Sequence, residues 1–274
     1  AALLEGVITV MEPGELGNKE SGVDAGLVAA MLGIMDPTQV QDALTPEMAE
    51  DLAGKMSASD VGLLDSDSAA AMMSTMGAGT AATAMEADSL ASMIGVMDGE
   101  AIAQTLDAES AGAIAQALTG ENLEGLGAEQ AAGIAAAMDP DQLAALDADQ
   151  AAGMATAISA EPDQLLEMDS ESVAAMATTM EASDMGALGS DMVGTMMAAM
   201  DSEQLGGMSD EHMAEALETT GADHMGAGAA NFDEIEAAAT FLSEAPVETP
   251  ESFAEMMQAE EAASFFSGMF GGES

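Results

Sequence analysis

Nine acidic residues recur at one position of a repeated sequence pattern, and carboxylates arranged in series can bind divalent cations. Each lies two residues before the first apolar anchor of the second expected helix of its unit. We call these residues the carboxylate ladder: Glu47, Asp67, Asp88, Glu109, Glu129, Asp149, Glu171, Asp191 and Glu211.

Two interpretations of the ladder fit the sequence. A carboxylate in the first turn of a helix complements the helix dipole by about 0.3–1 kcal/mol, which would explain the column without any ligand. Alternatively, the ladder collects Ca²⁺ or Mg²⁺. Stacked helices lie roughly 8–10 Å apart, so an ion would need a second carboxylate, such as Asp139 or Asp141 beside Asp149, together with carbonyl groups and water.

The charge of the chain excludes several other functions. Among 274 residues, 51 are Asp or Glu and two are Lys (Lys19 and Lys55), which gives a formal net charge of −49. Nucleic acid is therefore not an expected partner, because phosphate binding needs a basic surface. Cysteine is absent, so disulfides and thiolate metal sites are excluded. Without Trp or Tyr and without a distinguished cleft, the sequence predicts no enzyme and no required cofactor.

The histidines and methionines are weak metal candidates. His212 and His224 lie twelve residues apart in the sequence, and we expect each to be an exposed polar side chain. The methionine clusters occupy the same positions as Leu and Ile elsewhere in the pattern, so they predict core packing rather than capture of a soft metal.

The pattern itself is a repeat of 20–22 residues, represented by DPDQLAALDADQAAGMATAI (139–158). Its last position is occupied by Ile34, Met56, Met76, Met97, Leu118, Met138, Ile158, Met180, Met200 and Thr220. The second half of each unit has apolar residues at helical spacing. The expected faces include Ala151, Met154, Ala155 and Ile158; Val193, Met196, Met197 and Met200; and Leu27, Ala30, Met31 and Ile34.

The sequence of each unit therefore predicts two short helices, and Asp, Ser or Thr at the expected N-caps marks where these helices begin. Helices this short are marginal in water and must stack on their neighbours. The sequence predicts an all-α fold, an α-solenoid (superhelix) of about ten short two-helix repeats with non-repeat N- and C-terminal segments.

The motif D-P-x-Q-hydrophobic-x-x-hydrophobic followed by D-A-D-Q-A-A-x-hydrophobic resembles the cytoplasmic N domain of MgtE-type magnesium transporters. It is also similar to the middle domain of the flagellar switch protein FliG. The best match runs over 99–200. The resemblance implies a superhelix of short acidic helical units and a cation-responsive surface, and it assigns no site residue.

The ends of the chain differ from the repeat. We expect an N-terminal non-repeat segment (1–20), a solenoid (21–242), and a linker with an apolar C-terminal helix and flexible tail (243–274). The ends are apolar where solenoids usually carry polar caps. They predict subunit contacts through Val7, Ile8, Val10, Phe253, Met256, Met257, Phe265, Phe266 and Phe270. The alternative is that the C-terminal helix caps its own solenoid.

Together these features predict an exported structural protein that assembles head to tail into an acidic extracellular filament or surface layer, modulated by divalent cations. The expected partners are other copies of the chain and inorganic cations. No apolar run reaches the roughly 18 residues of a membrane-spanning helix. The first residue is Ala, which suggests signal-peptide removal and an extracellular or cell-surface location; tag removal would also explain it. The alternatives are a soluble Ca²⁺- or Mg²⁺-binding module and a scaffold for a basic partner.

Overall fold

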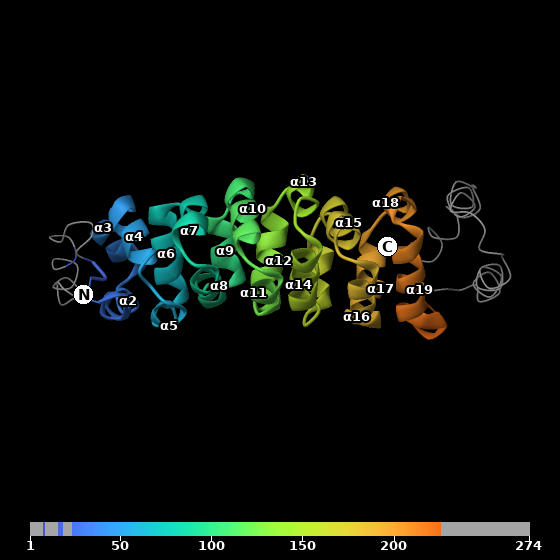
Figure 1. Ribbon diagram of the computed structural model, residues 1–274, viewed down its shortest axis with the longest axis horizontal. Helices are drawn as coiled ribbons and strands as arrows, with labels where there is room; N and C mark the ends of the chain where they lie inside the picture. The colour runs from blue at the N-terminus through green and yellow to red at the C-terminus, as the bar shows by residue number, and fades with distance from the viewer. Residues whose placement is uncertain (1–7, 9–15, 19–23, 226–274) are drawn as a thin grey trace.

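The fold of the described residues is all-α, and it is built from short helices that alternate along the chain. A computed structural model describes residues 8, 16–18 and 24–225. The predicted boundary at 242/243, the segment 243–274 and most of 1–20 lie outside this part. Within it, the secondary structure outside the helices includes one isolated bridge, between Gly17 and Asp24. Figure 1 shows the helices stacked side by side into an elongated rod, with α2 near one end and α19 at the other.

Each repeat unit consists of a first and a second helix, as the sequence predicts. The first helices are α3 (Pro37–Ala43), α5 (Ala58–Val61), α7 (Ala78–Ala84), α9 (Gly99–Thr105), α11 (Gly120–Glu124), α13 (Pro140–Leu143), the 3₁₀ helix η1 (Pro162–Glu167), α16 (Ala182–Ala187) and α18 (Ser202–Gly207). The second helices are α2 (Ala25–Leu32), α4 (Pro46–Ala53), α6 (Ser66–Met76), α8 (Ala87–Val96), α10 (Ala108–Ala117), α12 (Ala128–Ala137), α14 (Ala148–Ile158), α15 (Ser170–Thr179), α17 (Ser190–Ala199) and α19 (Asp210–Met225).

The helices begin where the sequence places their caps. Asp147 is the N-cap of α14, and its carboxylate accepts a hydrogen bond from the backbone N–H of Gln150 at 2.8 Å. Thr45, Asp65 and Asp107 cap α4, α6 and α10 in the same way. These bonds satisfy backbone donors that have no partner within the helix.

One expected face is wrong by one residue. In α2 the structure buries Val28, Leu32 and the following Met35, while Leu27 is 50% and Ile34 70% exposed. Asp24 caps the start of α2, but the helix sequence AGLVAAML is apolar on every side, so the pattern alone left two faces open. Met35 precedes Asp-Pro as Met138 does, and it is the true end of the first unit.

The other two expected faces, on α14 and α17, are confirmed. Residues such as Met154, Ile158, Val193 and Met196 are at most 1% exposed, and they belong to one core cluster that runs through the stack. Methionines fill this core beside Leu and Ile, as predicted from their position in the repeat.

Each unit contacts the next two units along the chain. A first helix packs on the second helix of the following unit, as α5 does on α8, α9 on α12 and α11 on α14. A second helix also contacts the first helix two units on, as α6 does with α9 and α12 with η1. This recurring pattern shows the repeat character in three dimensions, while a regular superhelix, the stricter meaning of solenoid, stays a prediction.

Hydrogen bonds also join units that are two apart along the chain. In five of the second helices, the third residue donates a side-chain proton to a carbonyl at or just after the end of the second helix two units earlier. The bonds run from Ser68 to Leu32 (3.0 Å), Ser89 to Met56 (2.9 Å), Gln130 to Met97 (2.8 Å), Gln150 to Leu118 (2.7 Å) and His212 to Met180 (2.8 Å). They satisfy carbonyls that a helix C-terminus leaves without an intrahelical partner.

The helices α11 and α14 approach each other closely. A methyl group at Gly153 would collide with the carbonyl oxygen of Gly120, and one at Gly120 would collide with that of Asp149. These backbone groups cannot move aside as a flexible side chain could. The absence of a side chain at both glycines is therefore what lets α14 lie against α11.

We expect Gln150→Ala to lower the free energy of unfolding by about 1–3 kcal/mol. Gln150 is 8% exposed and also donates to the Ala115 carbonyl at 3.2 Å, so its loss leaves buried acceptors unpaired. Urea denaturation followed by circular dichroism measures the change. Gln104→Ala is the control, since Gln104 is exposed and bonds Glu100 in its own helix. An equal effect of both substitutions would contradict a role for the bonds that join α14 to α10.

Gly153→Ala should destabilise the protein by about 1–3 kcal/mol, because the added methyl forces α11 and α14 apart. Gly95→Ala is the matched control. Gly95 also lies inside a second helix, and a methyl there meets no atom within 4 Å. This control should stabilise the protein by roughly 0.5–1 kcal/mol, because alanine is the better helix former. The same urea assay reports both, and a tolerated Gly153→Ala would show that the close approach is not required.

Candidate cation-binding surface

The structure places the carboxylate ladder at the surface, with every member in the first turn of a second helix. All nine side chains are exposed, and the same position is acidic in each second helix from α4 to α19. The placement confirms the helix positions expected from the sequence. It agrees with the interpretation that these groups complement helix dipoles, and cation binding by the ladder stays a prediction.

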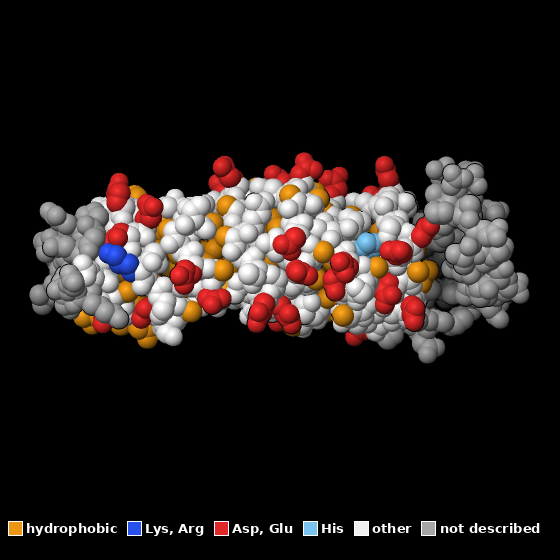
Figure 2. All heavy atoms as spheres, viewed as in Figure 1, with side chains coloured by type: hydrophobic (Ala, Val, Ile, Leu, Met, Phe, Trp, Pro, Cys, Tyr) orange, Lys and Arg blue, Asp and Glu red, His pale blue; other side chains and the backbone are white. Residues whose placement is uncertain are grey.

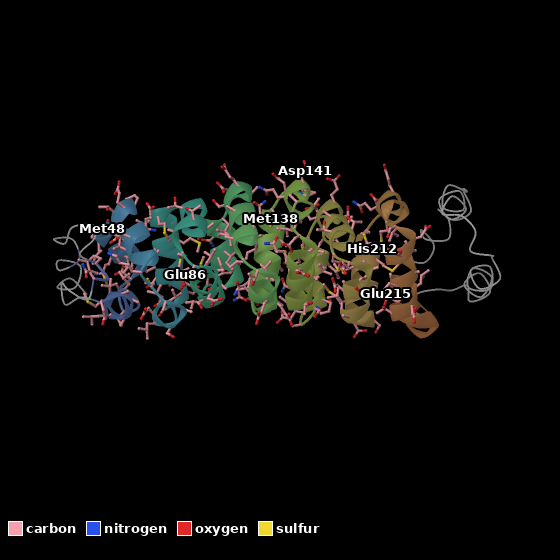
Figure 3. The ribbon with its side chains drawn as sticks, viewed as in Figure 1. Met48, Glu86, Met138, Asp141, His212 and Glu215 are labelled. Atoms are coloured by element: carbon pink, nitrogen blue, oxygen red, sulfur yellow. The ribbon has the colours of Figure 1, made fainter. Side chains whose placement is uncertain are left out.

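The ladder members do not converge on one point. In the part of the chain that the structure describes, no group of three or more His, Asp or Glu side chains lies close enough to hold a metal ion. Asp141, which the sequence suggested as a second ligand beside Asp149, lies at the outer edge of the stack in Figure 3. The arrangement is therefore suited to many weakly held counterions along the surface rather than to one closed coordination site.

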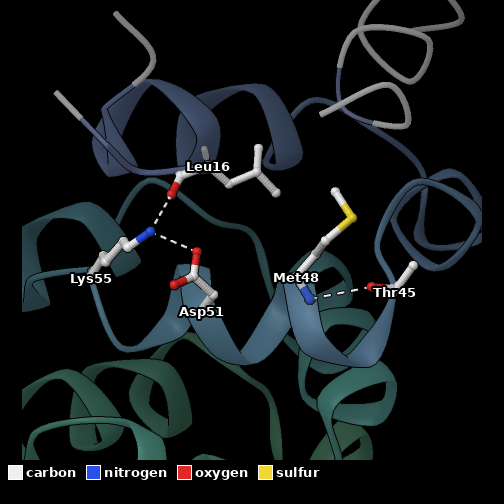
Figure 4. Close-up of polar contacts among 5 residues, drawn as sticks. All are labelled: Leu16, Thr45, Met48, Asp51 and Lys55. Carbon is white, nitrogen blue, oxygen red and sulfur yellow. Dashed lines mark hydrogen bonds and ion pairs between the residues drawn. The ribbon is translucent and has the colours of Figure 1, made fainter. Parts of the chain in front are cut away.

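Acidic side chains are scattered along the whole visible face of the described part (Figure 2), with the blue atoms of one lysine near the N-terminal end. That residue is Lys55, which donates to the Leu16 carbonyl at 2.9 Å and pairs with Asp51 at 2.6 Å (Figure 4). It ties the segment around Leu16 to α4. Surface carboxylates elsewhere in the described residues depend on solvent ions to reduce their repulsion.

Two N-cap carboxylates have perturbed acidities. Hydrogen bonds from the Ser110 backbone and side chain lower the pKa of Asp107. At Asp169, burial raises the pKa, but hydrogen bonds from the Ser172 hydroxyl and backbone outweigh it and the pKa is lowered. The two bonds from Ser172 are 2.7 and 2.9 Å long. Both caps are therefore firmly ionised at neutral pH and contribute to the negative surface.

His212 is not the exposed side chain that the sequence suggested. Figure 3 places it within the stack near α17 and α19, and it is half-buried. Its Nδ1 lies 2.6 Å from the Ser209 hydroxyl and its Nε2 lies 2.8 Å from the Met180 carbonyl. The carbonyl can only accept, so Nε2 carries a proton, and the ring serves as a structural donor. His224 has no described side chain.

The predicted subunit contacts fall into two groups. Val7, Val10, Phe253, Met256, Met257, Phe265, Phe266 and Phe270 lie outside the described residues. Ile8 is 1% exposed and belongs to the chain's own core together with Leu16. We therefore do not retain Ile8 as a subunit contact, because a side chain enclosed by its own chain cannot face a neighbour.

A different set of apolar side chains is exposed near the N-terminal end. Leu27, Ile34 and Leu63 are 50%, 70% and 50% exposed. Leu27 lies in α2 and Ile34 in the turn that follows it, and this turn lies against the backbone of Leu63, which a methyl at Gly33 would strike. We call these three residues the N-terminal apolar patch.

The comparisons with known proteins give no relative: no family model, no curated protein and no solved structure matches the chain. The resemblance to the MgtE N domain and the FliG middle domain is thus supported only as far as an all-α, repeat-like fold. Among the described helices, none has both the length and the apolar character needed to cross a bilayer.

We expect Ca²⁺ to raise the melting temperature more than NaCl of equal ionic strength does, because a divalent ion screens and bridges carboxylates better. The comparison is 10 mM CaCl₂ with about 30 mM NaCl, measured by circular dichroism. A gain of 1 kcal/mol corresponds to roughly 2–4 °C for a chain of this size. Identical melting temperatures would overturn the prediction.

A pair of variants separates ladder binding from general screening. One replaces three ladder residues, Glu47, Glu109 and Glu171, by Gln. The other replaces three exposed glutamates outside the ladder, Glu50, Glu124 and Glu218, and so changes the net charge equally. If the ladder holds Ca²⁺, the first variant alone loses much of the calcium-specific increase. Equal losses would leave the helix dipole as the explanation of the ladder.

Proposed function

We propose that this chain is a structural protein that assembles head to tail into an acidic filament or surface layer. The observation that supports the proposal most directly is the N-terminal apolar patch, which lies near one end of an elongated stack and exposes three large apolar side chains. Stacked repeats present an unfinished apolar surface at each end unless a polar cap covers it. An end that keeps such residues in water is suited to contact with another molecule.

The complementary surface comes from the other end of the sequence. The segment SFAEMMQAEEAASFFSGMF (252–270) contains four of the six phenylalanines of the chain. Burying a Phe, Leu or Ile side chain contributes about 1.5–3 kcal/mol. A contact between unlike ends is heterologous, and when its rotation does not close a ring it generates a fibre.

The acidic surface would control how assembled filaments associate with one another. Carboxylates along the stack keep neighbouring filaments apart at low salt, because like charges repel within a Debye length of about 10 Å at 0.1 M salt. Divalent cations reduce that repulsion and would favour side-by-side association into a layer. The extracellular location remains an expectation from the sequence, which fractionation of the producing cells would check.

A scaffold for a basic partner is the second candidate. It is favoured by the full exposure of the carboxylate ladder, which leaves nine carboxylates accessible on the surface. Complementary charge speeds association and selects partners, and such binding weakens strongly with salt. If a basic partner stays bound in 0.5 M NaCl, this electrostatic mode of binding is contradicted.

We expect purified protein to form fibres or sheets of uniform width in negative-stain electron microscopy with 5 mM CaCl₂. The variant Ile34→Ser/Leu63→Ser should raise the critical concentration at least tenfold, because a tenfold change requires a loss of only about 1.4 kcal/mol at the contact. Leu166→Ser is the matched control, since Leu166 is 60% exposed but lies on η1, away from the patch. Sedimentation gives the critical concentration.

Discrete monomers of the unaltered protein, both in EDTA and in CaCl₂, would remove assembly as the function. Fibres that form equally well from the double variant would retain assembly but reject the N-terminal apolar patch as the contact. Circular dichroism of each variant checks that the helical fold is unchanged.

A further inference from the structure

Two carboxylates meet beside the N-terminal apolar patch. Asp24 is the N-cap of α2, and its carboxylate accepts a hydrogen bond from the backbone N–H of Leu27 at 2.8 Å. Asp60 lies in α5, three residues before Leu63, and is half-buried. A methyl at Gly26 would lie 2.5 Å from Oδ1 of Asp60 and 3.7 Å from Oδ1 of Asp24. The two oxygens are therefore within roughly 6 Å of each other, close enough for like charges to disfavour each other.

The elements packed around this pair add more negative charge. The helix α5 packs against α2 and α8. Between its caps α2 carries no charged side chain, while α8 begins with Glu86 and Asp88. Lys55 supplies positive charge at this end of the described residues, and it pairs with Asp51 at 2.6 Å. Lys19 lies outside the described residues. The border of the patch is thus acidic on both helices that carry it.

The segment that would cover the patch is acidic as well. Residues 252–270 contain Glu255, Glu260 and Glu261 beside their Phe and Met residues, and 226–274 contain no Lys, Arg or His. Docking this segment of a second copy on the patch would bring its glutamates toward Asp24 and Asp60. Apolar burial favours the contact, whereas repulsion between carboxylates opposes it. The balance between these two terms depends on how many of the carboxylates are charged.

We propose that the head-to-tail contact is switched on by acid, through protons taken up by the carboxylates that meet at the N-terminal apolar patch. This inference rests on the proposed assembly. A nearby like charge raises the pKa of a carboxylate, so carboxylates at the contact bind protons more readily in the assembled state than in the free subunit. A state that binds more protons is favoured as the pH falls. Assembly therefore strengthens below neutral pH.

The window from pH 7.0 to 5.5 separates this switch from general discharge of the surface. An ordinary Asp or Glu has a pKa of about 4 and remains almost fully ionised at pH 5.5. Most of the charge of −49 therefore persists across this window. A response of assembly to pH within it reports carboxylates that the contact itself brings together.

Sedimentation of the full chain in 150 mM NaCl with EDTA gives the critical concentration at the two pH values. We expect it to fall at least fivefold from pH 7.0 to 5.5. The variant Asp24→Asn/Asp60→Asn keeps the helix starts, because Asn caps as well as Asp. It should lower the critical concentration at pH 7.0 at least threefold and respond to pH less than twofold. The control Asp141→Asn/Asp163→Asn removes equal charge at exposed positions on α13 and η1 and should keep the full response.

The outcomes distinguish this inference from the proposed assembly. Fibres that form in 5 mM CaCl₂ at pH 7.0, but form no more readily in EDTA at pH 5.5 than at pH 7.0, would overturn the acid switch and leave assembly intact. Equal pH responses of the two double variants would also overturn it, because total charge would then explain the effect. Absence of fibres under every condition would reject assembly and the switch together. Circular dichroism at both pH values checks that the fold is retained.

Discussion

The structure depends on the stacking of short helices, because each helix alone would leave backbone groups without hydrogen-bond partners and apolar side chains in water. Most of the described helices have ten or fewer residues, and isolated helices of that length are marginal in water. Each unit therefore relies on the two units that follow it. The side chains of Ser68, Ser89 and Gln150 connect second helices two units apart and satisfy carbonyls at their ends. The apolar core continues through the same contacts, so neither could form without the other.

The second constraint is a charge of −49 on a chain that is 49% hydrophobic. The repeat separates the two kinds of residue within each second helix: a cap and a carboxylate in the first turn, then buried Ala, Leu, Ile or Met. Acidic groups at helix N-termini are stabilised by the helix dipole, which allows a strongly acidic protein to stay folded with few lysines. The remaining repulsion links the stability of the fold to the ions around it.

The proposed assembly uses the N-terminal apolar patch, near one end of the stack. Inside the repeat, neighbouring units cover one another's apolar surface. Near the end of the stack an apolar surface lacks its usual neighbour, and that surface is then available to another molecule.

Much of this architecture could be read from the sequence. The period, the caps at Asp65, Asp107 and Asp147, the prolines at helix starts and the buried face of α14 follow from local rules that need no distant residue. The register of α2 could not be read in the same way, because its sequence is apolar all round and only packing against α5 chooses Val28 and Leu32 over Leu27 and Ile34.

Contacts between distant residues were decided by the tertiary structure alone. The polar side chains at the third position of second helices, such as Gln150 and His212, can be found in the sequence next to the ladder residues. The carbonyl groups that accept their hydrogen bonds lie 32 or more residues earlier. Likewise, the sequence contains Gly120 and Gly153, yet it does not show that these glycines let α14 lie against α11. Helix starts are determined by residues within a few positions, whereas partners across units are determined by how the helices stack.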